Sequence, residues 1–170
     1  QKGKPIQGLD PAQVQRLCDE VRREGEVLQC ANFLCPANVA VSGHNAACER
    51  IADAATQAGA MKVVPLAVAG AFHTQIMRPA DERLAEALSD VPMRRPRIPV
   101  ISNVDARPHN DPEEIRQLLI KQILSPVLWE ESMRYLLGQG FNQFYEVGPG
   151  RVLRGLMKRI DRKIECNGVA

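Results

Sequence analysis

Apolar residues recur along the chain at two spacings, one typical of helices and the other of strands. A helix is predicted after the start signal Asp10-Pro11, with Gly25 as its stop. Its apolar stripe comprises Val14, Leu17, Cys18 and Val21. Two short apolar runs, 27–31 and 39–41, flank the turn-forming residues 35–38 and predict a β-hairpin.

The first part of the chain follows the order of a ferredoxin-like unit. A second helix is expected over 45–58 and a strand over 61–66, which gives the order helix, strand, strand, helix, strand. A strand ahead of these elements would complete the β-α-β-β-α-β pattern. That leading strand has the weakest pattern, because Lys2-Gly3-Lys4-Pro5 offers little apolar surface before Ile6.

The second part alternates helices with short strands. Helices are expected over 78–89, from Asp111-Pro112, from Ser125-Pro126 and over 151–160. Glu114 stands three residues after Asp111, as in a capping box. Strands are expected over 98–101, short and buried, and over 141–147, and the last helix is expected to bury Val152, Leu153, Leu156, Met157 and Ile160. This alternation predicts an α/β or mixed α+β fold.

Charge and composition exclude several classes of protein. The 170 residues include 22 Lys and Arg against 20 Asp and Glu, a net charge of +2, too balanced for bulk electrostatic binding to nucleic acid or to a membrane surface. No apolar run approaches the roughly 20 residues of a membrane span, and no signal peptide is visible. The five cysteines include no Cys-x-x-Cys pair, which argues against a zinc site or a secreted disulfide framework. We therefore expect reduced thiols in a cytoplasmic protein without a metal.

Three histidines are candidates for acid–base chemistry. His73 follows a small-residue turn over 67–71 and precedes a helix, a position where α/β sheets place their sites. Its imidazole suits proton transfer near neutral pH, although a structural role gives the same pattern. His44 stands at a helix start, which favours a structural role, and His109 is expected to be solvated in a polar loop.

Two further features have more than one interpretation. Gln122 falls on the apolar stripe seven residues after Ile115, so its amide is either satisfied by backbone at the helix end or part of a site. Gly148-Pro149-Gly150 lacks the phosphate-binding glycine and lysine spacings and predicts a tight turn. The basic residues that follow share one helix face, which is either a solvated face or a docking patch. They are Arg151, Arg154 and Lys158.

Five segments together resemble motifs of the malonyl-CoA:acyl-carrier-protein transacylases. They match in the family's order and spacing and cover the chain from about residue 8 to residue 160. The segments are 39–44, 70–77, 99–105, 122–129 and 145–153. The resemblance implies transfer of malonyl from coenzyme A to a serine and then to the phosphopantetheine thiol of acyl carrier protein.

The resemblance also implies particular residue roles. His73 matches the family's catalytic histidine, and Gln122 matches the residue whose main-chain carbonyl orients it. Phe72 matches the pattern associated with malonyl rather than methylmalonyl units, and Asn32 and Asn103 match residues near the substrate. The basic residues implied in docking the acidic carrier are Lys62, Arg151, Arg154 and Lys158. Malonyl-CoA is the substrate and no cofactor is implied.

Several family motifs have no counterpart in the chain: the serine elbow, the glycine-glutamine oxyanion motif and the arginine that binds the malonyl carboxylate. We therefore expect the C-terminal portion of such an enzyme, with a ferredoxin-like small subdomain over 1–67 and the last part of the α/β-hydrolase-like large subdomain over 68–170. The chain alone is expected to be inactive and to expose apolar residues of 98–101 and 141–147. The full enzyme is expected to be a monomer. Alternatives are a non-catalytic carrier-binding fragment and an acyltransferase domain of a polyketide synthase.

Overall fold

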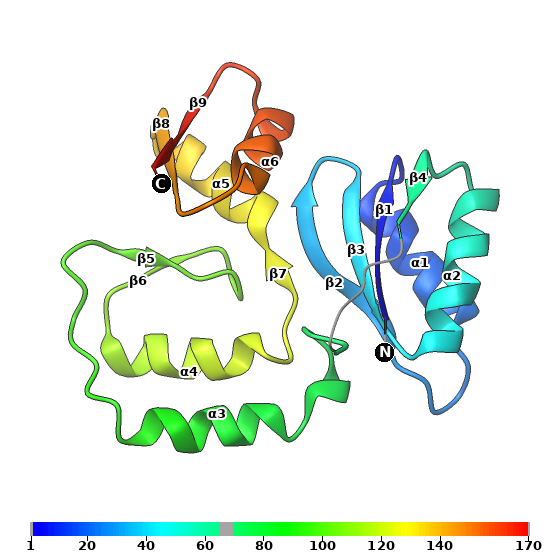
Figure 1. The fold of residues 1–170 in the computed structure, drawn as a ribbon, viewed down its shortest axis with the longest axis horizontal. Coiled ribbons are helices and arrows are strands. Elements are labelled where there is room, and N and C mark those ends of the chain that lie inside the picture. The colour runs from blue at the N-terminus through cyan, green and yellow to red at the C-terminus, as the bar shows by residue number, and fades with distance from the viewer. Residues whose placement is uncertain (1, 65–69, 170) are drawn as a thin grey trace.

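The computed structural model describes residues 2–64 and 70–169, which form a mixed α/β fold (Figure 1). Its first elements are β1 (Lys2–Gln7), α1 (Pro11–Val21), β2 (Leu28–Cys35), β3 (Asn38–Gly43), α2 (Asn45–Gln57) and β4 (Lys62–Val63). After a 3-10 helix (Gln75–Met77) come α3 (Ala80–Ser89), β5 (Val100–Ile101), β6 (Pro108–His109), α4 (Pro112–Gln122), β7 (Val127–Leu128), α5 (Trp129–Gly138), β8 (Gln143–Val147), α6 (Val152–Ile160) and β9 (Glu165–Val169).

The larger sheet has the strand order β4-β1-β3-β2-β7. Its first four strands are antiparallel to their neighbours, whereas β7 runs parallel to β2. The doubtful leading strand is present: β1 pairs with β3 over its whole length and with β4 at its end. Backbone pairing holds it, and Pro5, which has no N–H to donate, still accepts a hydrogen bond from Val64.

Helices α1 and α2 cover one face of this sheet and form the core of the molecule (Figure 1). Alternate strand residues such as Ile6, Val39 and Val41 are fully buried in that core. Ala40 and Ser42 alternate with them and therefore face the opposite side of the sheet.

Local signals placed α1 and the β2–β3 hairpin correctly. Asp10 and Gln13 form a reciprocal capping box at the start of α1. The helix ends at Val21, earlier than expected, because Arg22 is already extended, and Gly25 lies in the turn that follows with a φ of 77°. The hairpin turns at Pro36 and Ala37, as the sequence predicted.

The second part differs from the prediction where pairing is not local. Residues 127 and 128 form β7 against Asn32 and Phe33 rather than the first turn of a helix, so α5 begins at Trp129. The polar segment 165–169 was not expected to be a strand, yet it pairs in parallel with β8 as β9. The strand expected over 61–66 is seen as β4, while residues 65–69 and the expected boundary between 67 and 68 lie outside the described residues.

A set of apolar residues in the second part faces solvent, as expected for 98–101 and 141–147. Ile98 is 74% exposed and Val147 is 81% exposed. The expectation of a buried strand at 98–101 is wrong, because β5 pairs only with the two residues of β6 in the described part of the chain. The last helix is also less buried than expected: Met157 is buried, but Val152 and Leu153 are exposed.

The five cysteines, all within the described residues, form no disulfide; four are buried and Cys166 is half-buried. Across residues 2–64 and 70–169, no helix is long and apolar enough to cross a membrane.

Candidate active site

His73 is held at the junction between the first sheet and the end of α4. Its backbone has a φ of 64°, in the left-handed region that residues with a β-carbon rarely adopt. Its N–H donates to the carbonyl oxygen of Ile123 at 3.0 Å. Its ring Nδ1 lies 2.9 Å from the main-chain oxygen of Gln122. The structure therefore brings together the two residues that the sequence singled out.

The contact with Gln122 determines which ring nitrogen of His73 carries the proton. A carbonyl oxygen can only accept a hydrogen bond, so Nδ1 is the protonated nitrogen in this contact. In the neutral ring, Nε2 then keeps its lone pair and is available as a base. This is the tautomer that a general base needs.

The side-chain amide of Gln122 is satisfied by backbone at the helix end, one of the two interpretations that the sequence left open. Its side-chain amide donates to the carbonyl oxygens of Ser125 at 2.9 Å and Pro126 at 3.2 Å, just past the end of α4. The amide thus stabilises the turn that ends α4, and the main-chain oxygen of Gln122 in that turn contacts His73. A polar residue on an apolar stripe is thus explained by the backbone groups that its amide satisfies.

A hollow of about 260 Å³ lies beside His73. Phe72 and Asn32 line it, together with small residues on the sheet face that α1 and α2 leave uncovered: Gly3, Ala40 and Ser42. Phe72 is 43% exposed, and its ring centroid lies 6.4 Å from that of His73. A hollow of this volume suits a small acyl group better than a drug-sized ligand.

Asn103 does not line the hollow beside His73. It lines a second cavity of about 180 Å³ between β5 and α4, which Gln122 also lines. Its main-chain oxygen accepts a hydrogen bond from Leu128 at 2.8 Å. Asn103 is therefore near Gln122 but on another cavity than Phe72 and Asn32.

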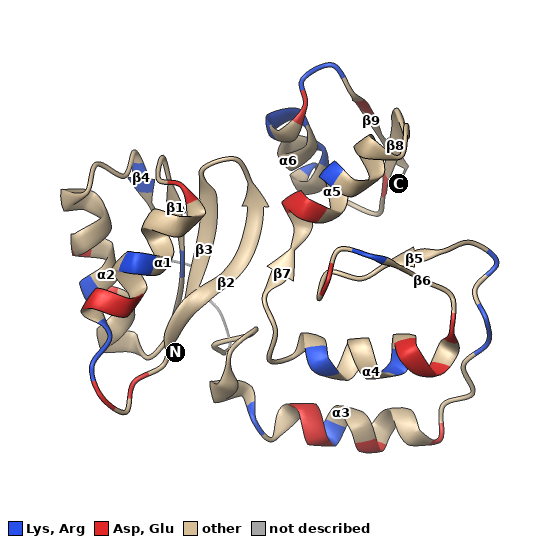
Figure 2. Ribbon diagram, turned by 180° about the vertical axis from the view of Figure 1, so that it is seen from behind, with Lys and Arg blue, Asp and Glu red and all other residues tan. Residues whose placement is uncertain are grey.

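The basic residues expected to dock a carrier do not form one patch. Lys62 lies on the edge strand β4, whereas α6 packs near β2 at the other side of the sheet, and Figure 2 shows the two groups well apart. Arg154 is engaged, because its Nε lies 3.3 Å from Glu146 and its Nη2 donates to Gly150 at 3.0 Å. Arg151, the N-cap of α6, and Lys158, within that helix, are both exposed.

Glu146 anchors the start of α6 to β8. Its carboxylate accepts hydrogen bonds from the backbone N–H groups of Leu153 at 2.9 Å and Arg154 at 3.1 Å. These hydrogen bonds, that of Leu153 first, lower the pKa of Glu146 below its ordinary value. The tight turn predicted for Gly148-Pro149-Gly150 connects the two elements.

The other two histidines have structural positions. His44 is the N-cap of α2 and accepts a hydrogen bond from the N–H of Val27 at 2.8 Å, so the structural interpretation is confirmed. The expectation that His109 is solvated is wrong, because it is only 7% exposed.

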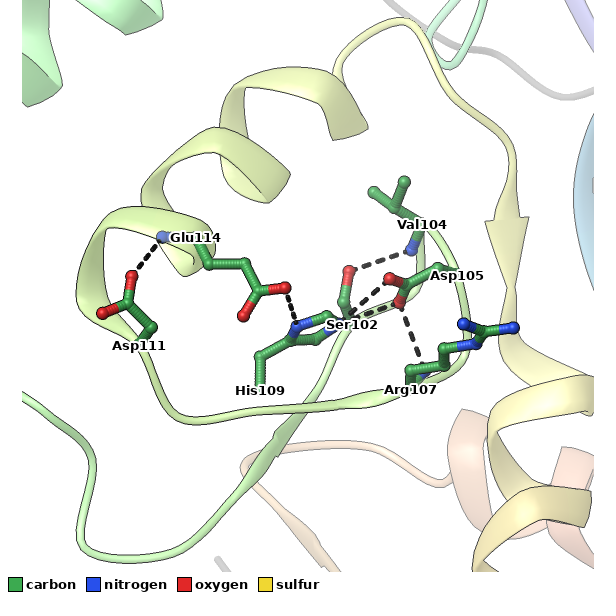
Figure 3. Close-up of polar contacts among 7 residues, drawn as sticks. All are labelled: Ser102, Val104, Asp105, Arg107, His109, Asp111 and Glu114. Carbon is green, nitrogen blue, oxygen red and sulfur yellow. Dashed lines mark hydrogen bonds and ion pairs between the residues drawn. The ribbon is translucent and has the colours of Figure 1, made fainter.

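His109 is buried between two carboxylates (Figure 3). Its Nε2 lies 3.0 Å from Asp105 and its Nδ1 lies 3.0 Å from Glu114. Glu114 thus faces the histidine instead of completing the expected capping box at the start of α4. Burial alone would lower the pKa of His109, but the hydrogen bonds with Asp105 and Glu114 outweigh it and raise the pKa.

Known proteins resemble this chain in sequence over most of its length. No family model matches the chain. It is 38% identical to the malonyl CoA-acyl carrier protein transacylase of Bacillus subtilis over 97% of its own length and 52% of the relative. It is 41% identical to the transacylase of the same name from Escherichia coli over 91% of its length and 50% of the relative.

Solved structures give the same result. The transacylase from Coxiella burnetii matches with a TM-score of 0.95 and 36% identity, over 98% of this chain and 52% of that one. A malonyl-transacylase solved in complex with a type II polyketide synthase acyl carrier protein matches with a TM-score of 0.91 and 38% identity, over 98% and 53%. The chain is therefore similar to the malonyl CoA-acyl carrier protein transacylases, as its motifs predicted, and spans about half the length of the curated relatives it matches.

Proposed function

We propose that this chain is the histidine-bearing part of a transferase of fatty acid biosynthesis. The whole enzyme would move a malonyl group from coenzyme A to the phosphopantetheine thiol of acyl carrier protein. The contact that carries this proposal is the 2.9 Å hydrogen bond from His73 Nδ1 to the main-chain oxygen of Gln122. The names of the homologues, malonyl CoA-acyl carrier protein transacylases, support the substrate and the carrier.

In the first half-reaction, His73 Nε2 accepts the proton of a serine hydroxyl while the serine oxygen attacks the malonyl thioester carbon. The carbon–sulfur bond to coenzyme A breaks, and the imidazolium returns the proton to the departing thiolate. The serine would lie in the part of the whole enzyme that corresponds to the unmatched half of the relatives. Gln122 stabilises the imidazolium by accepting the hydrogen bond from Nδ1–H throughout.

In the second half-reaction, the carrier thiol gives its proton to His73 Nε2, and its sulfur attacks the malonyl-serine ester. The serine oxygen leaves and regains the proton from the imidazolium, which returns the enzyme to its starting state. Phe72 would crowd a branch at the substrate's α-carbon and so favour malonyl over methylmalonyl. Asn32 would contact the acyl group in the hollow, and Asn103 would act near Gln122, from the neighbouring cavity.

The strand order supports the two subdomains expected from the sequence. The order β4-β1-β3-β2 with antiparallel neighbours is that of a ferredoxin-like sheet, so residues 1–67 would form the small subdomain. Residues 68–170 would be the last part of the large α/β-hydrolase-like subdomain. Its exposed apolar residues, such as Ile98 and Val147, would pack against the rest of the enzyme. The whole enzyme would be a cytoplasmic monomer.

The proposal can be tested by combining the chain with the half of a relative that it does not match. The chain would be co-expressed with the unmatched half of the Bacillus subtilis transacylase, and transfer of radiolabelled malonyl from coenzyme A to holo acyl carrier protein would be measured. We expect no transfer by the chain alone, transfer by the pair, and a loss of at least 100-fold with His73→Ala. The control is His44→Gln, which keeps an acceptor at a structural position. Full transfer with His73→Ala would overturn the assignment.

A second candidate function is a carrier-binding fragment without catalysis, favoured by the exposed basic side chains of Arg151, the N-cap of α6, and Lys158 within that helix. It would bind acyl carrier protein alone in a titration, and charge reversal at both positions would abolish this binding. Binding that does not weaken with added salt would count against it. A third candidate is an acyltransferase domain of a polyketide synthase, which would use the same chemistry but would be one domain of a longer polypeptide.

A further inference from the structure

The backbone of His73 needs support from outside its own loop. A φ of 64° is unfavourable for a residue with a β-carbon, so the surrounding contacts must hold this conformation. The ring leaves the backbone at the same α-carbon. Any rotation of the adjoining peptide groups therefore moves the ring relative to Gln122.

Contacts from two parts of the fold hold the two peptide groups of His73. Its N–H donates to Ile123 at 3.0 Å, at the end of α4. Its carbonyl oxygen accepts a hydrogen bond from the side-chain Nε2 of Gln29 at 2.9 Å. Gln29 lies on β2, 44 residues earlier in the chain. A residue of the first sheet thus fixes the orientation of the peptide group that follows the histidine.

The register of the sheet explains why Gln29 reaches this point. Gln29 pairs with Ser42 on β3, and directly paired residues point to the same face of a sheet. Ser42 lines the hollow beside His73, on the face away from α1 and α2. Cys30, the next residue, belongs instead to the core under those helices. The side chain of Gln29 is therefore directed to the site by the pleat of β2.

We propose that Gln29 is a positioning residue that holds the His73 backbone so that its ring Nδ1 stays on the carbonyl of Gln122. The consequence for catalysis rests on the proposed function of His73 as the base. Gln29 touches no reacting atom in this scheme. Its amide selects the tautomer of the ring indirectly, because only the held backbone keeps Nδ1–H on its acceptor.

The first experiment measures the tautomer in the full chain by NMR of the ¹⁵N-labelled histidine ring. The variant Gln29→Met keeps the side-chain length and removes the donor. We expect the parent His73 to be protonated at Nδ1, and Gln29→Met to populate both tautomers. We also expect exchange of the Nδ1 proton with water to become at least 10-fold faster. The matched control is Gln15→Met, on the exposed side of α1.

A His73 ring with unchanged tautomer and proton exchange in folded Gln29→Met would overturn the proposal. If that variant fails to fold, the unmodified chain still decides the question through its side-chain amides. The amide protons of Gln29 should exchange at least 10-fold more slowly than those of Gln15, and equal rates would overturn the proposal. Failure of transfer by the assembled enzyme would instead contradict the proposed function and leave this placement intact.

Discussion

At the scale of single residues, the buried histidine outside the candidate site makes a clear prediction about pH. His109 has a raised pKa in the folded chain, so its ion pairs stabilise the fold fully below the unfolded value near 6.5. This contribution is lost as the pH rises through the higher folded pKa. We expect His109→Gln to reduce the free energy of unfolding by about 1 kcal/mol at pH 6 and by less at pH 8.5.

Urea unfolding of parent and variant between pH 5.5 and 8.5 measures this difference. Glu114→Gln is the companion variant, since it keeps an acceptor near Nδ1 but removes one of the two charges. It should flatten the pH dependence without abolishing it. A difference between parent and His109→Gln that grows with rising pH would contradict the assignment of a charged histidine.

The sequence could have shown part of this cluster. Asp105, His109 and Glu114 lie close together in the chain, and two acids flanking a histidine can hold it protonated. The polar residues around His109 led to the prediction of a solvated side chain. Its burial depends instead on the packing of α4 against the loop, which the local sequence does not indicate. His73 and Gln122, in contrast, could be singled out by position and motif, although their contact joins segments 49 residues apart.

At the scale of elements, the β2–β3 turn carries a residue that does not suit its conformation. Ala37 follows Pro36 with a φ of 54°, and a turn of this kind favours glycine at its second position. We expect Ala37→Gly to raise the free energy of unfolding by roughly 0.5 kcal/mol, because relief of the left-handed strain exceeds the added entropy of the unfolded chain.

Denaturant unfolding compares this variant with Ala54→Gly, inside α2. The same substitution in a right-handed helix should destabilise by about 1 kcal/mol. The two variants must therefore shift the unfolding midpoint in opposite directions. A lower midpoint for Ala37→Gly would show that the turn is not under strain.

Elements whose signals are local were predicted well, and those that depend on distant partners were not. The capping box of Asp10 and the apolar stripe of α1 lie within one segment, and so does the Pro36 turn. By contrast, β7 exists because residues 127–128 meet β2, and β9 exists because residues 165–169 meet β8. Neither segment has a strand pattern of its own, so the sequence alone gave no signal.

At the scale of the whole molecule, the exposed apolar residues of the second part predict self-association. Many large apolar side chains exposed to water favour packing against another surface. We expect sedimentation velocity to show concentration-dependent association of the parent and a broad thermal transition. The double variant Ile98→Lys with Val147→Lys should remain monomeric at concentrations where the parent associates, with stability changed by about 0.5 kcal/mol or less.

The control for this variant adds the same charge elsewhere. Gln15→Lys with Gln57→Lys places two lysines on exposed positions of α1 and α2, in the first part of the chain. This pair should associate as the parent does. A monodisperse parent with a sharp, cooperative melt would contradict the prediction.

The parallel pairing of β7 with β2 has a consequence for how the chain can be divided. β7 occupies the outer hydrogen-bonding edge of β2, although it lies almost 100 residues later in the sequence. A shortened version that stops before residue 127 would leave the amide and carbonyl groups of Asn32 and Phe33 without this partner. Unpaired backbone groups at a sheet edge can form hydrogen bonds with a strand of another molecule. We therefore expect such a C-terminal truncation to promote aggregation or domain swapping through β2.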